Sequence, residues 1–140
     1  LNFSRFEFTC KFKIIRAARF FLDSPAMLYP NLDYKNNNFH KDHLHPDDRY
    51  DELSDELKEK YPYWMYNSIV NLQMLDANEN ESKGKIPLKN WVENELKKTN
   101  NRKQFFDSHL IPDIDLEQSN FDEFYQKRKE ILSKKLKDIL

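Results

Sequence analysis

The sequence predicts an α+β fold in which a small β component is combined with a mainly helical chain. Residues 5–15 alternate apolar and polar side chains, and residues 68–75 form a short, β-branched apolar run, so both segments are expected to be strands. Residues 120–140 instead place apolar side chains at helical spacing over several turns. With 140 residues, 39% of them hydrophobic, the chain can form one domain with its own core.

The first half of the chain contains three further expected segments. Residues 16–23 have a helical pattern, and residues 23–38, which contain two prolines and end in an asparagine run, are expected to form a loop. Residues 47–61 read as a short polar helix because Tyr50, Leu53 and Leu57 recur at helical spacing. Asp47 or Asp48 is expected to cap that helix.

The second half is predicted to be helical after the strand at 68–75. A helix is expected from Asn78 onward, broken near Gly84 and Pro87 and resumed over residues 88–98. Another is expected over residues 102–111, where Pro112 ends it.

The last helix has the clearest pattern. Asn120, followed three residues later by Glu123, resembles a capping box at its start. One stripe of this helix is expected to pack against the core: Phe121, Phe124, Tyr125, Arg128, Leu132, Lys135, Leu136 and Ile139.

Composition limits the possible classes of function. The single glycine argues against a glycine-rich phosphate loop, and the single cysteine, Cys10, excludes an internal disulfide and agrees with a reducing, cytoplasmic location. There is no apolar run of the length that a membrane-spanning helix needs. The net charge of −1 hides a basic stretch, because residues 83–104 carry seven basic and two acidic side chains. Such a stretch permits, but does not require, contact with nucleic acid.

Residues 38–46, NFHKDHLHP, place three histidines and an aspartate close together. Imidazole titrates near neutral pH and binds metals, so this cluster is a candidate site. Residues 67–85, NSIVNLQMLDANENESKGK, supply further amide and lysine side chains downstream.

Together these segments give an ordered set of motifs: Asp42-His43, Asn71-Leu72, Asn80 and Lys83. The order resembles the HNH, or ββα-metal, nucleases, in which an Asp-His pair ends the first strand of a hairpin. In that pattern an Asn-Leu lies on the second strand and an Asn or His on the helix that follows. Over roughly residues 28–140, the sequence is most similar to the HNH-type C-terminal domain of GmrSD-like restriction endonucleases. The similarity includes the motif FYQKRKEIL near the C-terminus.

The resemblance implies specific roles. Asp42 and Asn80 are expected to bind a divalent metal, Mg²⁺ or Mn²⁺, since such ions prefer oxygen ligands. His43 is expected to act as the general base that deprotonates water. The Asn71 side-chain amide is expected either to tie the metal hairpin together or to orient the loop that carries His43. Phosphate contacts are expected from Lys83 and, by proximity, from Lys85.

Strand geometry poses a difficulty for this site. Neighbouring side chains on a regular strand point to opposite faces, so Asp42 and His43 need a twist or bulge at the strand end to face one phosphate.

Several alternatives stay open. A zinc site made of His40, His43 and His45 is possible on donor chemistry, although we expect His40 and His45 to be structural or to lie at the rim of the site. Asn78 is the alternative to Asn80, and His109 is expected to be a packing residue.

The segment 47–66, which separates Asp42-His43 from the second strand, is acidic and would repel a DNA backbone. We therefore expect it to pack away from the cleft, buried by the aromatic side chains of the YPYWMY motif at residues 61–66. The alternative is that these aromatics stack on an unpaired base.

The expected architecture is thus a ββα-metal hairpin and helix within a mainly helical domain. It comprises a core at 28–92 and a helical extension at 93–140, preceded by a segment of unclear origin at 1–27. The expected function is metal-dependent cleavage of DNA in restriction or anti-phage defence, with a nucleotide-hydrolysing N-terminal domain outside this chain. A degenerate module that binds DNA or protein, and a toxin nuclease that cleaves RNA, are the alternatives.

Overall fold

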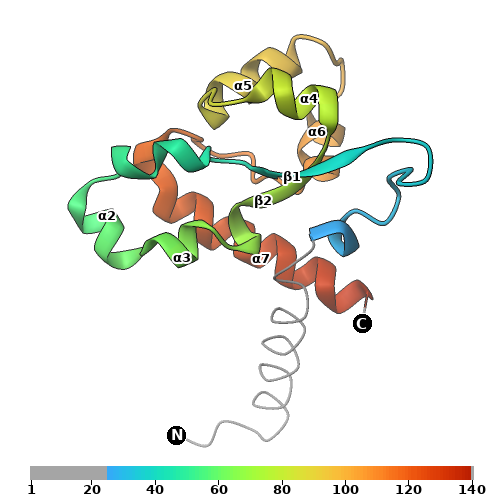
Figure 1. Ribbon diagram of the computed structural model, residues 1–140. Coiled ribbons are helices and arrows are strands. Elements are labelled where there is room, and N and C mark those ends of the chain that lie inside the picture. The colour runs from blue at the N-terminus through green and yellow to red at the C-terminus, as the bar shows by residue number, and fades with distance from the viewer. Residues whose placement is uncertain (1–24, 140) are drawn as a thin grey trace, which may run out of the picture.

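The computed structural model describes residues 25–139 and has an α+β fold, as predicted. Two strands, β1 (Phe39–His43) and β2 (Leu72–Asp76), pair in an antiparallel sheet. The long helix α7 (Phe121–Ile139) crosses on one side of this sheet, and α4 (Ala77–Lys83) and α5 (Leu88–Leu96) lie on the other (Figure 1). The strand predicted over 5–15 and the helix predicted over 16–23 lie outside the described residues.

Shorter helices are the other regular elements of the described chain. They are the 3₁₀ segments η1 (Pro25–Leu28), η2 (Asp47–Glu52), η3 (Ile69–Asn71) and η4 (Gln118–Asn120), together with α2 (Asp55–Lys60), α3 (Tyr63–Tyr66) and α6 (Arg102–His109). Within residues 25–139, no helix has both the length and the apolar character that crossing a lipid bilayer requires.

The hairpin and the helix after it form one continuous unit. The strand register is regular, with Asp42 opposite Gln73 and His43 opposite Leu72. Helix α4 begins directly after β2, where the Asp76 side chain caps it by accepting a hydrogen bond of 2.9 Å from the backbone N–H of Asn78. The helix ends at Gly84, whose φ of 45° favours glycine. The predicted break there is confirmed, and residues 42–43 lie at the end of a strand, as expected.

The segment 47–61 differs from the single helix that was predicted. It divides into η2 and α2 because Leu53 and Ser54 adopt extended backbone between them. Leu53 is buried in the core, and the Ser54 hydroxyl caps α2 by accepting from the backbone N–H of Leu57 at 3.2 Å. The predicted cap at Asp47 or Asp48 is therefore wrong, since the true α-helical cap lies at Ser54.

Helix α7 buries most of its predicted stripe. The buried side chains are Phe121, Phe124, Tyr125, Arg128, Leu132 and Leu136, whereas Ile139 is exposed and Lys135 half-buried. The buried aromatic rings of Tyr61 and Tyr66 pack against Phe121. Asn120 and Glu123 do interact, but through their side chains, with the Asn120 amide donating to the carboxylate at 2.9 Å.

Arg128 connects α7 to the sheet. Its side chain is fully buried, and its guanidinium donates to the carbonyl oxygen of Leu72 at 2.7 Å and to the hydroxyl of Tyr29 at 3.1 Å. Because a buried cation needs hydrogen-bond acceptors, this residue fixes α7 against β2 and against the segment that follows η1.

Replacing Arg128 with Met should reduce the free energy of unfolding measured by urea denaturation. Each of the two buried acceptors loses its donor, which costs about 1–3 kcal/mol per group. The matched control is Lys129→Met, an exposed neighbour on the same helix, which should change stability by less than about 0.5 kcal/mol. Equal stabilities of the two variants would show that the buried guanidinium does not hold α7 in place.

Candidate active site

A pocket of about 320 Å³ lies where the end of β1 meets η2 and α4. It is lined by Lys41, Asp42, His43, Pro46, Asp47, Asp48, Asn80, Gly84 and Lys85. Four of the predicted site residues, Asp42, His43, Asn80 and Lys85, therefore surround one cavity, although they come from two segments nearly 40 positions apart in the sequence. The other two, Asn71 and Lys83, lie in the protein interior behind it.

Asp42 is a buried carboxylate with three polar contacts. Only 6% of its surface is exposed. Lys83 Nζ donates to Oδ1 at 3.2 Å and lies 3.1 Å from Oδ2, while Gln73 Nε2 donates to Oδ2 at 2.8 Å. Burial raises the pKa of the Asp42 carboxyl, and the charge of Lys83 opposes this change.

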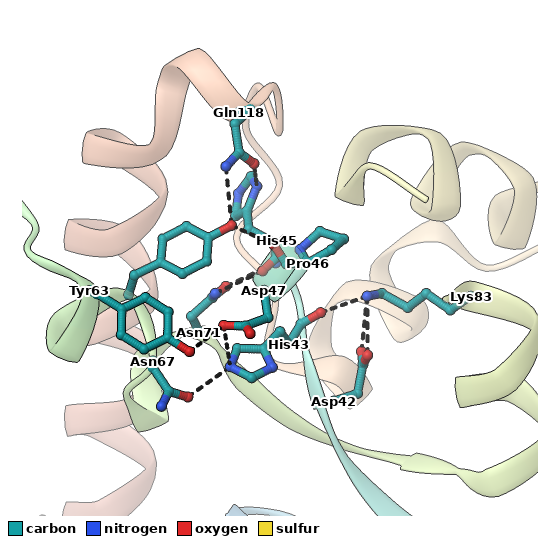
Figure 2. A network of polar contacts seen from close by, with 11 residues as sticks. Asp42, His43, His45, Pro46, Asp47, Tyr63, Asn67, Asn71, Lys83 and Gln118 are labelled. Atoms are coloured by element: carbon teal, nitrogen blue, oxygen red, sulfur yellow. Dashed lines mark hydrogen bonds and ion pairs between the residues drawn. The ribbon is translucent and has the colours of Figure 1, made fainter. Parts of the chain in front are cut away.

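Lys83 does not have the exposed position that was expected of a phosphate contact. Its side chain is 0% exposed, and its ammonium also donates to the backbone carbonyl of His43 at 2.6 Å (Figure 2). Burial lowers the pKa of Lys83, and the Asp42 carboxylate counteracts this. The structure thus corrects the prediction: a buried carboxylate requires a counter-ion, and Lys83 supplies it.

Gln73 and His109 complete this buried network, and sequence reasoning missed their role. Gln73 is fully buried opposite Asp42, and its Oε1 accepts a hydrogen bond of 3.1 Å from Nδ1 of His109. Burial lowers the pKa of His109 to about 4, so its ring is neutral. A polar Gln within an apolar strand, directly across from Asp42, was the available signal. His109 packs against Trp91 and Phe105, as expected of a packing residue.

Two segments contact the Nε2 side of the His43 ring: the segment that follows β1 and the segment that precedes β2. Its Nε2 donates to Asn67 Oδ1 at 2.8 Å and lies 3.7 Å from Asp47 Oδ1. The Tyr63 hydroxyl donates a hydrogen bond of 2.8 Å to the same Asp47 oxygen (Figure 2). Because an amide oxygen can only accept, the neutral ring carries its proton on Nε2 and has a free lone pair on Nδ1.

The prediction that the segment 47–66 packs away from the cleft is therefore wrong. Asp47 and Asp48 line the pocket, and Tyr63 reaches Asp47. The cause is local: the chain turns directly after β1, and the buried Tyr66 hydroxyl donates to the carbonyl of Pro46 at 2.8 Å, which keeps η2 beside the strand end. The aromatic residues of the YPYWMY motif differ in burial. Tyr61 and Tyr66 are buried as expected, whereas Tyr63 and Trp64 are exposed.

Asp42 and His43 reach the pocket without the expected bulge. The register stays one-to-one through both residues, and their side chains leave the strand in different directions (Figure 2). Both nevertheless line the same cavity because the strand ends there, so the cavity extends around the end of the strand rather than over one face.

Asn80 is the helix asparagine that faces this pocket. It is half-buried, and its side-chain amide forms no hydrogen bond with any residue in the described part of the chain. Asn78 is exposed and borders a different cavity on the other side of α4. The structure thus favours Asn80 over the alternative.

The donor set suits a hard divalent cation. Asn80 offers an uncommitted amide oxygen, and the contacts from Lys83 and Gln73 leave Asp42 Oδ1 with one lone pair unused. One carboxylate and one amide oxygen are sufficient for an ion that keeps several of its waters.

Asn71 fastens the backbone that follows β1. The fully buried Asn71 side chain accepts from the backbone N–H of His45 and donates to the His45 carbonyl, each at 2.9 Å. This contact holds the segment immediately after His43 (Figure 2), and the role of Asn71 in supporting a metal site stays a prediction.

The three clustered histidines have separate environments. His40 is exposed and lies beside Asn38, whereas His45 is buried between Phe121 and Phe124 and donates from Nδ1 to Gln118 at 2.9 Å. In residues 25–139, no three His, Cys, Asp or Glu side chains come close enough to hold an ion. The described structure therefore does not form the alternative three-histidine zinc site.

The basic stretch at 83–104 is largely neutralised by ion pairs. Six of its seven basic side chains pair with carboxylates: Lys83 with Asp42, Lys85 with Asp48, Lys89 with Glu117, Lys98 with Glu95, Arg102 with Asp113 and Lys103 with Asp107. Lys85 is the pocket residue among them, 79% exposed and 2.7 Å from its partner. Its predicted phosphate contact would have to compete with Asp48.

Stability should fall as the pH is lowered because His45 is held neutral. Burial lowers the pKa of His45 to about 3, whereas the unfolded chain binds this proton with a pKa near 6.5. Between these values the unfolded state binds more protons, so His45 contributes a loss of up to about 1.4 kcal/mol per pH unit as the pH falls. His45→Asn keeps a donor for Gln118 but does not titrate.

The measurement is the free energy of unfolding at several values between pH 7 and pH 4. His45→Asn should show a shallower slope than the unmodified chain. A His45→Asn slope that equals that of the unmodified chain would contradict the assignment.

No protein-family model matches the chain, and no curated protein matches it. The candidate site therefore rests on the motif order in the sequence and on the geometry described above.

Proposed function

We propose that this chain is a metal-dependent endonuclease of the HNH, or ββα-metal, type that hydrolyses DNA phosphodiester bonds. The observation that carries the proposal is the single pocket lined by Asp42, His43 and Asn80 at the junction of a β-hairpin and the helix that follows it. The ordered motifs that resemble GmrSD-like nucleases support a role in restriction or anti-phage defence. The same resemblance suggests a nucleotide-hydrolysing partner domain outside this chain.

The proposed chemistry assigns one task to each side chain. Asp42 and Asn80 would hold Mg²⁺ or Mn²⁺, which supplies charge neutralisation at the phosphoryl oxygens. His43 accepts a proton from water at Nδ1, the nitrogen that Asn67 leaves free. The water oxygen bonds to phosphorus, the bond to the 3′ oxygen breaks, and the 3′ oxygen takes a proton from solvent to leave as a hydroxyl.

The surroundings of His43 suit a general base. Asn67 fixes the orientation of the ring, and the Asp47 carboxylate, 3.7 Å from Nε2, faces the positive charge that the ring gains with the proton. Tyr63 in turn holds that carboxylate.

Nuclease assays with point variants test the proposal. His43→Ala should lower the rate of cleavage by about 10²- to 10⁴-fold, the usual contribution of a general base. Asp42→Ala and Asn80→Ala should abolish metal-dependent cleavage, whereas Asn80→Asp keeps an oxygen ligand and should retain part of the activity. The matched control is Asn78→Ala on the same helix, which should cut at the normal rate.

Each outcome of these assays has a defined meaning. Cleavage by His43→Ala at the unmodified rate would remove the base assignment. Absence of cleavage by the unmodified chain with Mg²⁺ and Mn²⁺ would favour the degenerate binding module, in which the Asp42–Lys83 pair is purely structural. Stronger cleavage of RNA than of DNA in parallel reactions would favour the toxin nuclease. Chelation of the metal with EDTA should stop the reaction.

A further inference from the structure

The ammonium group of Lys83 has a fixed position beside the proposed metal ligand. It lies 3.2 Å from Oδ1 and 3.1 Å from Oδ2 of Asp42, and it donates to the His43 carbonyl at 2.6 Å (Figure 2). An ammonium has three protons, and these three oxygens are enough to accept all of them. The side chain is fully buried, with Nζ 5.8 Å from the centroid of the Trp91 ring. Because leaving this position costs the ammonium every acceptor, its charge stays beside Asp42.

This fixed charge acts on any second cation that binds Asp42. The unused lone pair of Oδ1 is the one that the proposed ion needs, so the ion and the ammonium would share one oxygen atom. Two cations that share an oxygen repel each other, and the repulsion is least screened where water is excluded, as it is around the buried Asp42. Lys83 therefore weakens the binding of a divalent ion to this carboxylate.

The other charges at the pocket do not compensate for Lys83. The pocket is lined by three acidic and two basic side chains: Asp42, Asp47, Asp48, Lys41 and Lys85. Lys83, directly behind Asp42, is the third basic group, so within residues 25–139 the charged side chains at this site balance. Asn80, the second proposed ligand, is neutral. The site thus lacks the excess negative charge that would hold a divalent ion by itself, and Mg²⁺ in proteins is commonly bound by one or two carboxylates together with substrate phosphates.

We propose that Lys83 makes metal binding depend on the substrate, so that a divalent ion binds Asp42 and Asn80 tightly only together with a phosphodiester. The phosphodiester contributes the missing negative charge and a further oxygen ligand. By linkage, the ion strengthens the binding of nucleic acid by the same factor, which for coupled sites is commonly about 5- to 150-fold. This inference rests on the proposed nuclease function and specifies how its metal site is regulated.

Titration with Mn²⁺, followed by the electron paramagnetic resonance signal of the free ion, tests the coupling without cleavage. The full chain with His43→Ala is titrated alone and with a short DNA duplex, because loss of the proposed base keeps the duplex intact during the measurement. The affinity for Mn²⁺ should be about 5- to 150-fold higher with the duplex present. The same titration of His43→Ala with Asp42→Asn added corrects for Mn²⁺ that is bound by the DNA itself.

Lys83→Met, made in the His43→Ala chain, tests whether the coupling originates from this ammonium. Without DNA, the variant should bind Mn²⁺ more tightly than its parent by a factor in the same range, and the duplex should add little. The matched control is Lys103→Met, which removes the exposed lysine that pairs with Asp107 on α6 and should bind Mn²⁺ as the parent does. Circular dichroism checks the fold of Lys83→Met, and if this variant is unfolded, the titrations of the parent decide alone.

Two results would overturn the inference: equal Mn²⁺ affinities of the parent with and without DNA, or equal Mn²⁺ affinities of a folded Lys83→Met variant and its parent without DNA. Either result would make the Asp42–Lys83 ion pair a purely structural contact. Failure of the nuclease proposal is distinguishable. Coupled binding of Mn²⁺ and DNA without cleavage by the unmodified chain leaves the coupling and removes the nuclease, whereas metal-dependent cleavage with uncoupled binding removes only the coupling.

Discussion

The buried carboxylate of Asp42 is the constraint on which the site depends. Because an ionised group at 6% exposure is costly unless it is paired, the fold must bring a cation and a hydrogen-bond donor to the end of β1. Lys83 comes from α4 and Gln73 from β2, so satisfying Asp42 fixes the helix against the hairpin. Through Gln73 the network extends to His109 on α6, which makes the helical extension part of the support for this residue.

Satisfying Asp42 also removes one positive charge from the protein surface. Lys83 is used internally, and the other basic side chains of 83–104, except Lys97, have carboxylate partners, so this stretch offers little uncompensated positive charge. For the proposed nuclease, this leaves few uncompensated cations in 83–104 to contact phosphates.

The sequence predicted local features better than contacts between residues that are distant in the chain. The strand end at His43, the break at Gly84 and the buried stripe of α7 depend on short-range spacing and on backbone freedom, and all three are present. The burial of Lys83 could not be predicted, since it follows from a carboxylate 41 positions away. The segment 47–66 was misplaced for a related reason: its acidic composition was weighed against DNA, whereas buried Tyr66 holds it beside the strand end through the Pro46 carbonyl.

The two halves of the site are supported by different parts of the molecule, and this bears on how the site can vary. Asp42 is fixed by the core through Gln73 and Lys83, whereas His43 is positioned by Asn67 and Asp47 in short segments at the surface. A change near Asn67 can therefore reorient the imidazole without disturbing the carboxylate. A change at Gln73 acts on the carboxylate first. In the proposed mechanism both groups act at one phosphate, so the segment that joins the strands determines how the proposed base is oriented relative to the proposed metal ligand.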